Sequence, residues 1–489
     1  MTSTSVASRA ALALILMAGF YVLALAIVIG LFSVPYLLWT ARLWGTWKLA
    51  LFCVIGGAIV LWSIVPRPDR FAPPGPLLGP NAQPALLAAI RSVAEATRQQ
   101  MPAEVYLVDD VNAWVAQRGG IMGFGSRRVM GLGLPLLQMV TARQLRAVLA
   151  HEFGHFYGGD TRLGPWVYKT REAIGRTLDN LAEHSEALQI PFQMYGALFL
   201  RLTHAVSRQQ ELTADALAVR VVGAQPLAEG LRVTHVGGAA FEAYWSQEVA
   251  PVLEKGFRPP ITEGLGRFMS VGAVEDSMAK LLDAVMEEEE GDPYDTHPPL
   301  RERLAALHVS ESARASSSDP RAVTLVEDVP SLEAALITHA AGPEKASTLE
   351  DIGWEEIGAR VLRPSWGRAV TENPKAFEGV TVGGFPEVAS RLTDFARSLK
   401  RQWGEPRDED HLKRKGLWFL AAALGDTLAE AGWSVESLPG EPYRLRRGGD
   451  TVEPLTEVES LVEGRASPED WRARAAAWGV AEADLGAGS

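Results

Sequence analysis

The run HEFGH places His151, Glu152 and His155 at a spacing that can bind a metal ion. On a helix, positions four residues apart lie one above the other, so both imidazoles can bind the same ion. Zinc held by two histidines and a carboxylate keeps a fourth position open for water and lowers the pKa of that water toward ~7. Glu152 would take the proton of this water as a general base and pass it to a leaving amine. Metal-assisted peptide hydrolysis is the chemistry that these residues favour, although two histidines on an ordinary helix also fit the run by itself.

A second pair of residues, also four apart, offers the missing ligand. The run SRQQELTAD contains Glu211 and Asp215, whose carboxylates share one face of a helix. A carboxylate buried on an apolar face is unfavourable unless it is paired or binds a metal. Glu211 would complete a site of two histidines and a glutamate, and Asp215 would accept a hydrogen bond from the outer nitrogen of a ligand imidazole. Each acid taken singly also fits a solvated helix residue, but their combination with HEFGH favours the metal site.

Four motifs in order resemble one family of enzymes. They are VYLVDDVNAW at 105–114, HEFGH at 151–155 followed by Asp160, SRQQELTAD at 207–215, and THPPLRER at 296–303. This series resembles the membrane-anchored zinc endopeptidases that include the bacterial HtpX heat-shock protease and the CAAX prenyl endopeptidases. The resemblance covers roughly residues 85–305.

The resemblance implies a role for each matching residue. Zinc would bind to His151, His155 and Glu211, with Glu152 as the base and Asp215 as the family's second acid. Asn112 and His297 would line the cleft and help to hold substrate or the developing oxyanion. His297 also fits a simpler role as a residue at the start of a helix, ahead of two prolines.

The sequence also predicts the elements that position these residues. Thr141 and Gln144 fit a capping box, which predicts a helix from Ala142 to about Tyr157. Further predicted helices cover residues 84–100, 166–188 and 191–223, and a strand covers 104–108. The glycine-punctuated stretch 117–136 indicates strands and tight turns. The family resemblance implies an edge strand near Gly119–Gly125 or Val129–Leu134, to which an unfolded peptide would add by backbone hydrogen bonds.

The first 65 residues indicate a membrane anchor. Uncharged runs at Ala11–Phe32 and Leu49–Pro66 are long enough to span a bilayer, and a short connection makes them a helical hairpin. A cleaved signal peptide is the alternative, but the first run is longer than a signal sequence and a second run follows it. Three arginines outside the hairpin against two basic residues within its connection favour a cytoplasmic catalytic region.

Composition excludes some classes of function and divides the rest of the chain. With 59 acidic and 47 basic residues, the net charge of -12 argues against a nucleic-acid partner. The single cysteine, Cys53, rules out an internal disulfide and a cysteine-based zinc site. We expect an α+β protein with a mainly helical zincin-like domain and a small β-sheet. The expected parts are a transmembrane hairpin (1–65), a Pro-rich spacer (66–84), the peptidase domain (85–309), a linker (310–324) and an α+β C-terminal region (325–489).

These observations lead to one principal hypothesis and one alternative. The chain would be a zinc endopeptidase of the bacterial inner membrane that acts on unfolded or membrane-associated polypeptides in quality control. The alternative is a membrane-tethered binding or scaffold protein whose peptidase domain is inactive or autoinhibited. Ala187–Leu200, the longest uncharged run between the zinc motifs, is too short to span a bilayer, so we expect a core helix or one at the membrane interface. Two spans cannot enclose a site within the membrane, which disfavours processing of prenylated proteins.

Overall fold

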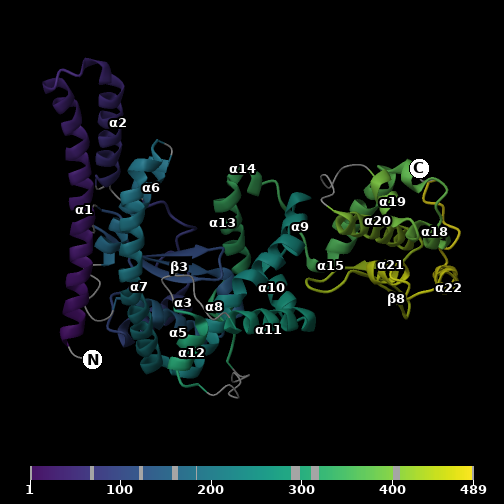
Figure 1. The fold of residues 1–489 in the computed structure, drawn as a ribbon. Coiled ribbons are helices and arrows are strands. Elements are labelled where there is room, and N and C mark those ends of the chain that lie inside the picture. Colours follow the sequence, from purple (N-terminus) through teal and green to yellow (C-terminus); the bar gives the residue numbers. More distant parts are fainter. Residues whose placement is uncertain are drawn as a thin grey trace. The chain divides into compact units, whose positions relative to one another are not determined.

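The computed structural model describes residues 3–65, 71–120, 125–156, 164–182, 184–287, 298–309, 319–399 and 408–486. The chain forms two compact units (Figure 1), one of residues 1–238 with 278–340, the other of residues 239–277 with 341–489. The described part is mainly helical with three small sheets, as expected for the α+β class. The bounds of the five predicted parts remain predictions.

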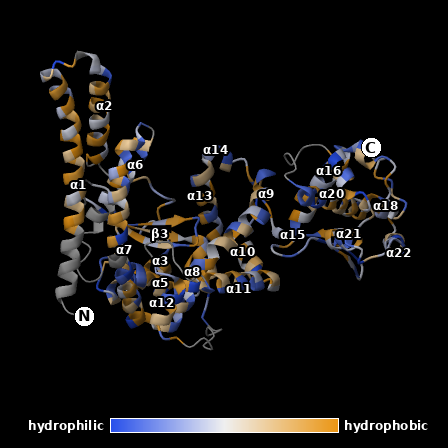
Figure 2. Cartoon of the chain, in the orientation of Figure 1, coloured by the Kyte–Doolittle hydropathy of each residue, from blue (hydrophilic) through white to orange (hydrophobic). Residues whose placement is uncertain are grey.

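Two apolar helices begin the first unit. They are α1 (Ser3–Thr40) and α2 (Trp47–Ile64), and both are long and apolar enough to cross a membrane. Figure 2 shows hydrophobic residues along most of the coloured length of both helices. Large apolar side chains such as Ile15, Val22 and Ile29 face outward and are about two-thirds exposed. Such a surface fits lipid contact and agrees with the predicted hairpin.

A second pair of helices packs against this hairpin. They are α6 (Gly164–Ala182) and α7 (Glu186–Val222), where sequence patterns predicted helices over 166–188 and 191–223. Phe192 and Phe199 of α7 are fully buried in one cluster with Phe20 of α1. The hydroxyl of Tyr195 donates to the carbonyl of Leu16 over 2.5 Å. One face of the uncharged run 187–200 is therefore buried in this cluster, whereas Ile190, Met194 and Leu198 on the rest of its surface are 53%, 70% and 48% exposed. This helix thus combines the two expected alternatives, a core face and an exposed apolar face.

A three-stranded sheet lies within the first unit. Its strands are β1 (Glu104–Val108), β2 (Ala113–Arg118) and β3 (Arg127–Gly133), in the order β1-β3-β2. β3 is parallel to β1 and antiparallel to β2. The free side of β1 is covered, because Leu78 N–H donates to Val105 O and Leu107 N–H donates to Pro76 O. Among the described residues, no strand pairs with the outer side of β2, which is therefore the open edge.

This order corrects one prediction. We expected the edge strand near Gly119–Gly125 or Val129–Leu134, but β3 is central and Val129 is paired on both sides. Gly119 and Gly120 follow β2 in a bend, and residues 121–124 lie outside the described part of the chain. Strand order depends on pairing between distant segments, which the motifs that carry the resemblance do not specify.

The helix that carries HEFGH is α5 (Ala142–Gly154), and its start is as predicted. The Thr141 hydroxyl accepts from the Gln144 N–H, and the Gln144 amide oxygen accepts from the Thr141 N–H. Helix α5 follows α4 (Leu134–Met139) and packs against α3 (Pro84–Ala96) and β2. Its buried face includes Leu145 and Leu149, so its core contacts fix the helix in the interior of the unit.

The second unit has its own core. Trp366, Phe385, Phe419 and Trp471 are buried together around a central helix, α20 (Glu409–Glu430).

The other α-helices and β-strands of the described residues, in both units, are α8 (Ala224–Tyr244), α9 (Ala250–Glu254), β4 (Phe257–Arg258), α10 (Ile261–Met269), α11 (Gly272–Glu287), α12 (Leu300–Ala306), α13 (Val329–Ala341), α14 (Pro343–Ala346), β5 (Glu350–Asp351), α15 (Trp354–Ile357), α16 (Arg363–Thr371), α17 (Pro374–Phe377), α18 (Phe385–Ala389), α19 (Leu392–Ser398), β6 (Ser434–Glu436), β7 (Arg444–Arg447), β8 (Asp450–Val452), α21 (Pro454–Val462) and α22 (Pro468–Trp478). The region after residue 325 thus mixes helix and strand, as the sequence indicated.

Candidate metal centre

The two motif helices, α5 and α7, approach each other closely at the end of α5. A Cβ at Gly154, the fourth residue of HEFGH, would lie 2.7 Å from the Cα of Ala214. Since real Cβ atoms do not approach that closely, only glycine allows this contact between the helices. The contact brings the side chains of His151 and Glu211 to the same place.

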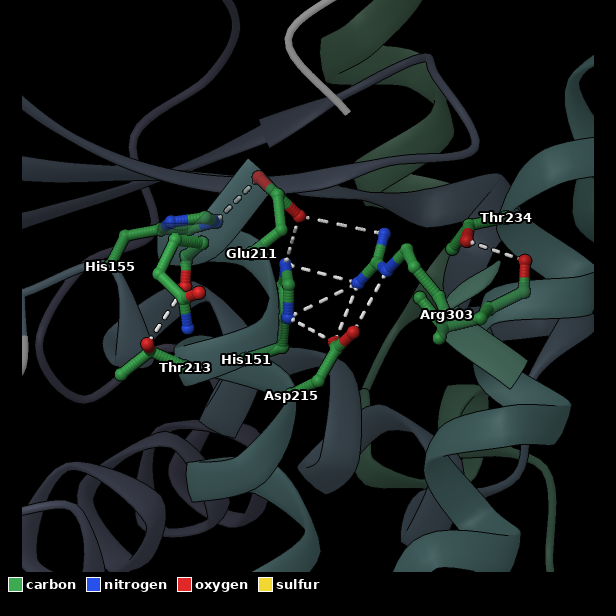
Figure 3. A network of polar contacts seen from close by, with 9 residues as sticks. His151, His155, Glu211, Thr213, Asp215, Thr234 and Arg303 are labelled. Carbon is green, nitrogen blue, oxygen red and sulfur yellow. Dashed lines mark hydrogen bonds and ion pairs between the residues drawn. The ribbon is translucent and has the colours of Figure 1, made fainter. Parts of the chain in front are cut away.

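Two imidazoles and one carboxylate converge at this crossing (Figure 3). Nε2 of His151 lies 3.4 Å from Oε2 of Glu211, and Nε2 of His155 lies 3.5 Å from Oε1 of the same residue. Ligand atoms that are each about 2.1 Å from a tetrahedral ion lie roughly 3.4 Å from one another. Both imidazole–carboxylate distances therefore match the separation of ligand atoms around a tetrahedral metal ion, and the donor types are those of a metal site.

One side of this cluster is open, and Glu152 lies beside it. His151 and Glu211 are about 5% and 4% exposed, whereas the side chain of His155 is 30% exposed. His151, Glu152 and His155 offer ligand atoms within 4.8 Å of one another. A base next to an accessible position is the arrangement that activation of a water molecule requires.

Asp215 contacts the outer nitrogen of the first histidine. Its Oδ1 lies 2.8 Å from Nδ1 of His151, and the carboxylate is 2% exposed. When Nδ1–H donates to this carboxylate, Nε2 is left with a free electron pair that faces Glu211. The sequence predicted Asp215 for this position.

Arg303 on α12 is a member of the cluster that the sequence did not predict. Its Nε and Nη2 donate to the two oxygens of Asp215 over 2.9 and 2.7 Å, and its Nη1 lies 3.6 Å from Oε2 of Glu211. The residue is 3% exposed, although arginine is rarely buried without a partner. Arg303 is the last residue of the run THPPLRER, in which only His297 was a predicted site residue. Because Arg303 and Asp215 are 88 residues apart in the chain, local spacing did not indicate that they pair.

The charges of the cluster favour a cation. Two buried carboxylates face one guanidinium, so the group carries an excess negative charge when His151 is neutral. Burial by itself would lower the pKa of His151, but hydrogen bonds to Asp215 and Glu211 outweigh burial and raise the pKa to about 9. Burial would raise the pKa of Asp215, but hydrogen bonds from His151 and Arg303 outweigh it and lower the pKa. Without a metal, a proton on His151 supplies the missing positive charge.

Of the other predicted site residues, Asn112 is the one within the described part of the chain. Asn112 precedes β2 with an exposed side chain, and its Oδ1 accepts from the N–H of Ala113. No contact of the described residues joins Asn112 to the metal ligands. His297 and Asp160 lie outside the described residues.

Comparison with known proteins supports the resemblance seen in the motifs. Residues 80–311 match the sequence profile of peptidase family M48. The chain is 23% identical over 249 residues to a protein named Protease HtpX homolog from Acidovorax ebreus (strain TPSY), in an alignment that covers 47% of this chain and 72% of that relative. No solved structure matches the chain significantly. Residues 80–311 therefore match peptidase family M48, and about half of the chain is similar to a relative named as an HtpX homologue.

Proposed function

We propose that this chain is a membrane-anchored zinc endopeptidase in which His151, His155 and Glu211 bind one Zn²⁺. The observation that carries the proposal is the convergence of two imidazoles and one carboxylate, from two helices, at the spacing of tetrahedral ligands. The excess negative charge of the buried cluster adds a reason for a divalent cation to bind there.

The residues of the chain would divide the work of hydrolysis. A bound Zn²⁺ would supply Lewis-acid chemistry that makes a water molecule acidic near neutral pH. Glu152 would accept the proton of that water and deliver it to the leaving amine. Asp215 would hold His151 in the tautomer that presents Nε2, and Arg303 would hold Asp215 and offset its charge. Asn112 and His297 would line the cleft, as the resemblance implies.

Polypeptides are the proposed substrates, and β2 is the proposed place for them to bind. β2 is the open edge of its sheet and packs against α5. An extended peptide that pairs with β2 would be held mainly by its backbone, so the preference for side chains would be loose. Loose preference suits unfolded or membrane-associated proteins in quality control, at a bacterial inner membrane with the peptidase domain in the cytoplasm. The proposed domain division places the hairpin at 1–65, the spacer at 66–84, the peptidase at 85–309, the linker at 310–324 and the C-terminal region at 325–489.

Cleavage of an unfolded protein such as casein by Glu152→Gln, together with metal analysis, tests this function. Loss of a general base lowers the rate by roughly 10²- to 10⁴-fold, whereas the zinc ligands stay in place. The variant should therefore keep its zinc and lose cleavage. Glu254→Gln, at an exposed glutamate of α9, is the matched control and should keep both. Undiminished cleavage by Glu152→Gln would remove Glu152 from its role.

A further inference from the structure

The segment that follows the matched family region lies against the start of the active-site helix. Residues 319–327, which we call the strap, come after the end of the match at residue 311. Arg321 forms an antiparallel bridge with Thr141, the residue that caps α5. The N–H of Ala142 donates to the carbonyl of Pro320 over 2.9 Å. The strap thus joins the backbone of α5 at its first residue.

Two more bonds join the strap to the turn that precedes α5. The N–H of Ala322 donates to the carbonyl of Val140 over 2.9 Å. The guanidinium of Arg321 donates through Nη1 to the carbonyl of Met139, the last residue of α4. The strap therefore contacts four consecutive residues, from Met139 to Ala142.

The hydrogen bond from Ala142 to Pro320 satisfies a backbone N–H that has no acceptor within the helix. The first backbone N–H groups of any helix have no partner within it. In α5, the capping box satisfies the N–H groups of Thr141 and Gln144. Pro320 satisfies that of Ala142. The strap therefore adds one satisfied donor, the N–H of Ala142, to the two that the capping box satisfies.

The other end of the strap is fixed to α3. Gln83, directly before α3, is 4% exposed, and its amide donates to Glu327 O over 2.9 Å and accepts from Glu327 N–H over 2.7 Å. Between the two ends, Ala322 and Val326 are buried, and the 3₁₀ helix Ala322–Leu325 packs against α4 and α5. Since α3 itself packs on α5, the strap is fixed to two helices that contact each other, α5 and α3.

We propose that the strap is a positioning segment of the peptidase, which sets the place of α5 and hence of His151 and Glu152. A helix moves as a stiff rod, so a shift at Ala142 is carried to His151, which is nine residues or about 13 Å further along. The contact of Gly154 with Ala214 leaves little room for such a shift. For its effect on cleavage this inference rests on the proposed function, whereas its effect on α5 does not.

Three variants of the full-length chain test the strap. Ala322→Pro removes the N–H that donates to Val140, and the backbone of Arg321 before it (φ -60°, ψ 144°) already has the conformation that a following proline requires. Arg321→Ala removes the bond to Met139, and Arg321→Lys restores a charged donor for the same carbonyl. Arg414→Ala, at an exposed position of α20, is the matched control.

Hydrogen exchange in the metal-free variants is the first measurement. In Ala322→Pro and Arg321→Ala, the amides of 142–154 should exchange roughly 2- to 30-fold faster, and those of α20 should not change. The dissociation constant of zinc should rise and kcat should fall by roughly the same factor, with KM nearly constant. Arg321→Lys should recover part of each effect.

Two results would overturn the proposal. One is unchanged exchange of 142–154 in both disruptive variants. The other is a lower melting temperature with full zinc affinity and full kcat at temperatures where the variants stay folded, because the strap would then only add stability. A wild-type chain that binds no zinc or cleaves no substrate would instead count against the proposed function, while the exchange measurement would still decide the role of the strap.

Discussion

The two halves of helix α7 are buried in opposite ways. In the first half, Phe192 and Phe199 pack into an apolar cluster with the hairpin helices. In the second half, Glu211 and Asp215 are as deeply buried, but they face His151 and Arg303. Apolar burial needs only a surface of matching shape, whereas buried carboxylates need specific partners of opposite charge. One continuous helix therefore contributes both to the apolar cluster of the hairpin and to the proposed metal centre.

Replacing the arginine of the charged half should give the largest effect. Arg303→Leu leaves two buried carboxylates without their guanidinium, and such a change typically costs about 3–5 kcal/mol of folding free energy. Denaturant unfolding of the metal-free chain measures this loss. Arg301→Leu, at an exposed position of the same helix, is the control and should change little. Equal stability of the two variants would show that the charged half does not depend on Arg303.

The charged half should also make stability depend on pH. The pKa of His151 is raised from 6.5 to about 9, so its stabilising contribution is complete below pH 6.5 and is lost as pH rises through 9. The metal-free chain should lose roughly 3 kcal/mol over this interval. Unfolding measured across the interval tests this loss, and His151→Gln, which lacks the titrating group, should not show it. A loss of the same size in His151→Gln would contradict the assignment.

The smallest expected effect comes from the apolar half. Tyr195→Phe removes the hydrogen bond to Leu16 O but keeps the ring, and one such bond contributes roughly 0.5–1.5 kcal/mol. Thermal unfolding in detergent should show a slight decrease, with the zinc content unchanged. Tyr36→Phe, at an exposed tyrosine of α1, serves as the comparison and should have no effect. A loss of zinc in Tyr195→Phe would show that the halves are not independent.

The sequence predicted those parts of the molecule whose signals are local. The capping box at Thr141, the strand at 104–108 and the i, i+4 pair Glu211 and Asp215 depend on residues that are near one another in the chain. Each corresponds to a fixed feature of helix or strand geometry, so residue spacing was enough to find them.

The features that the sequence missed depend on contacts between distant segments. The Arg303–Asp215 pair joins residues 88 positions apart, and the order β1-β3-β2 places a later strand between two earlier ones. The docking of α6 and α7 on the hairpin similarly joins Phe20 to Phe192. Hydrophobic periodicity identifies the face of a helix that is buried, but it does not identify the partner.

The most direct test of the zinc centre is the zinc content of the purified full-length chain and of Glu211→Gln, measured side by side after equilibration with zinc. The account predicts one zinc ion per wild-type chain and a large loss in the variant, because the carboxylate lies within 3.5 Å of both imidazoles. Zinc-free wild-type protein, or equal zinc affinity in the two chains, would contradict it.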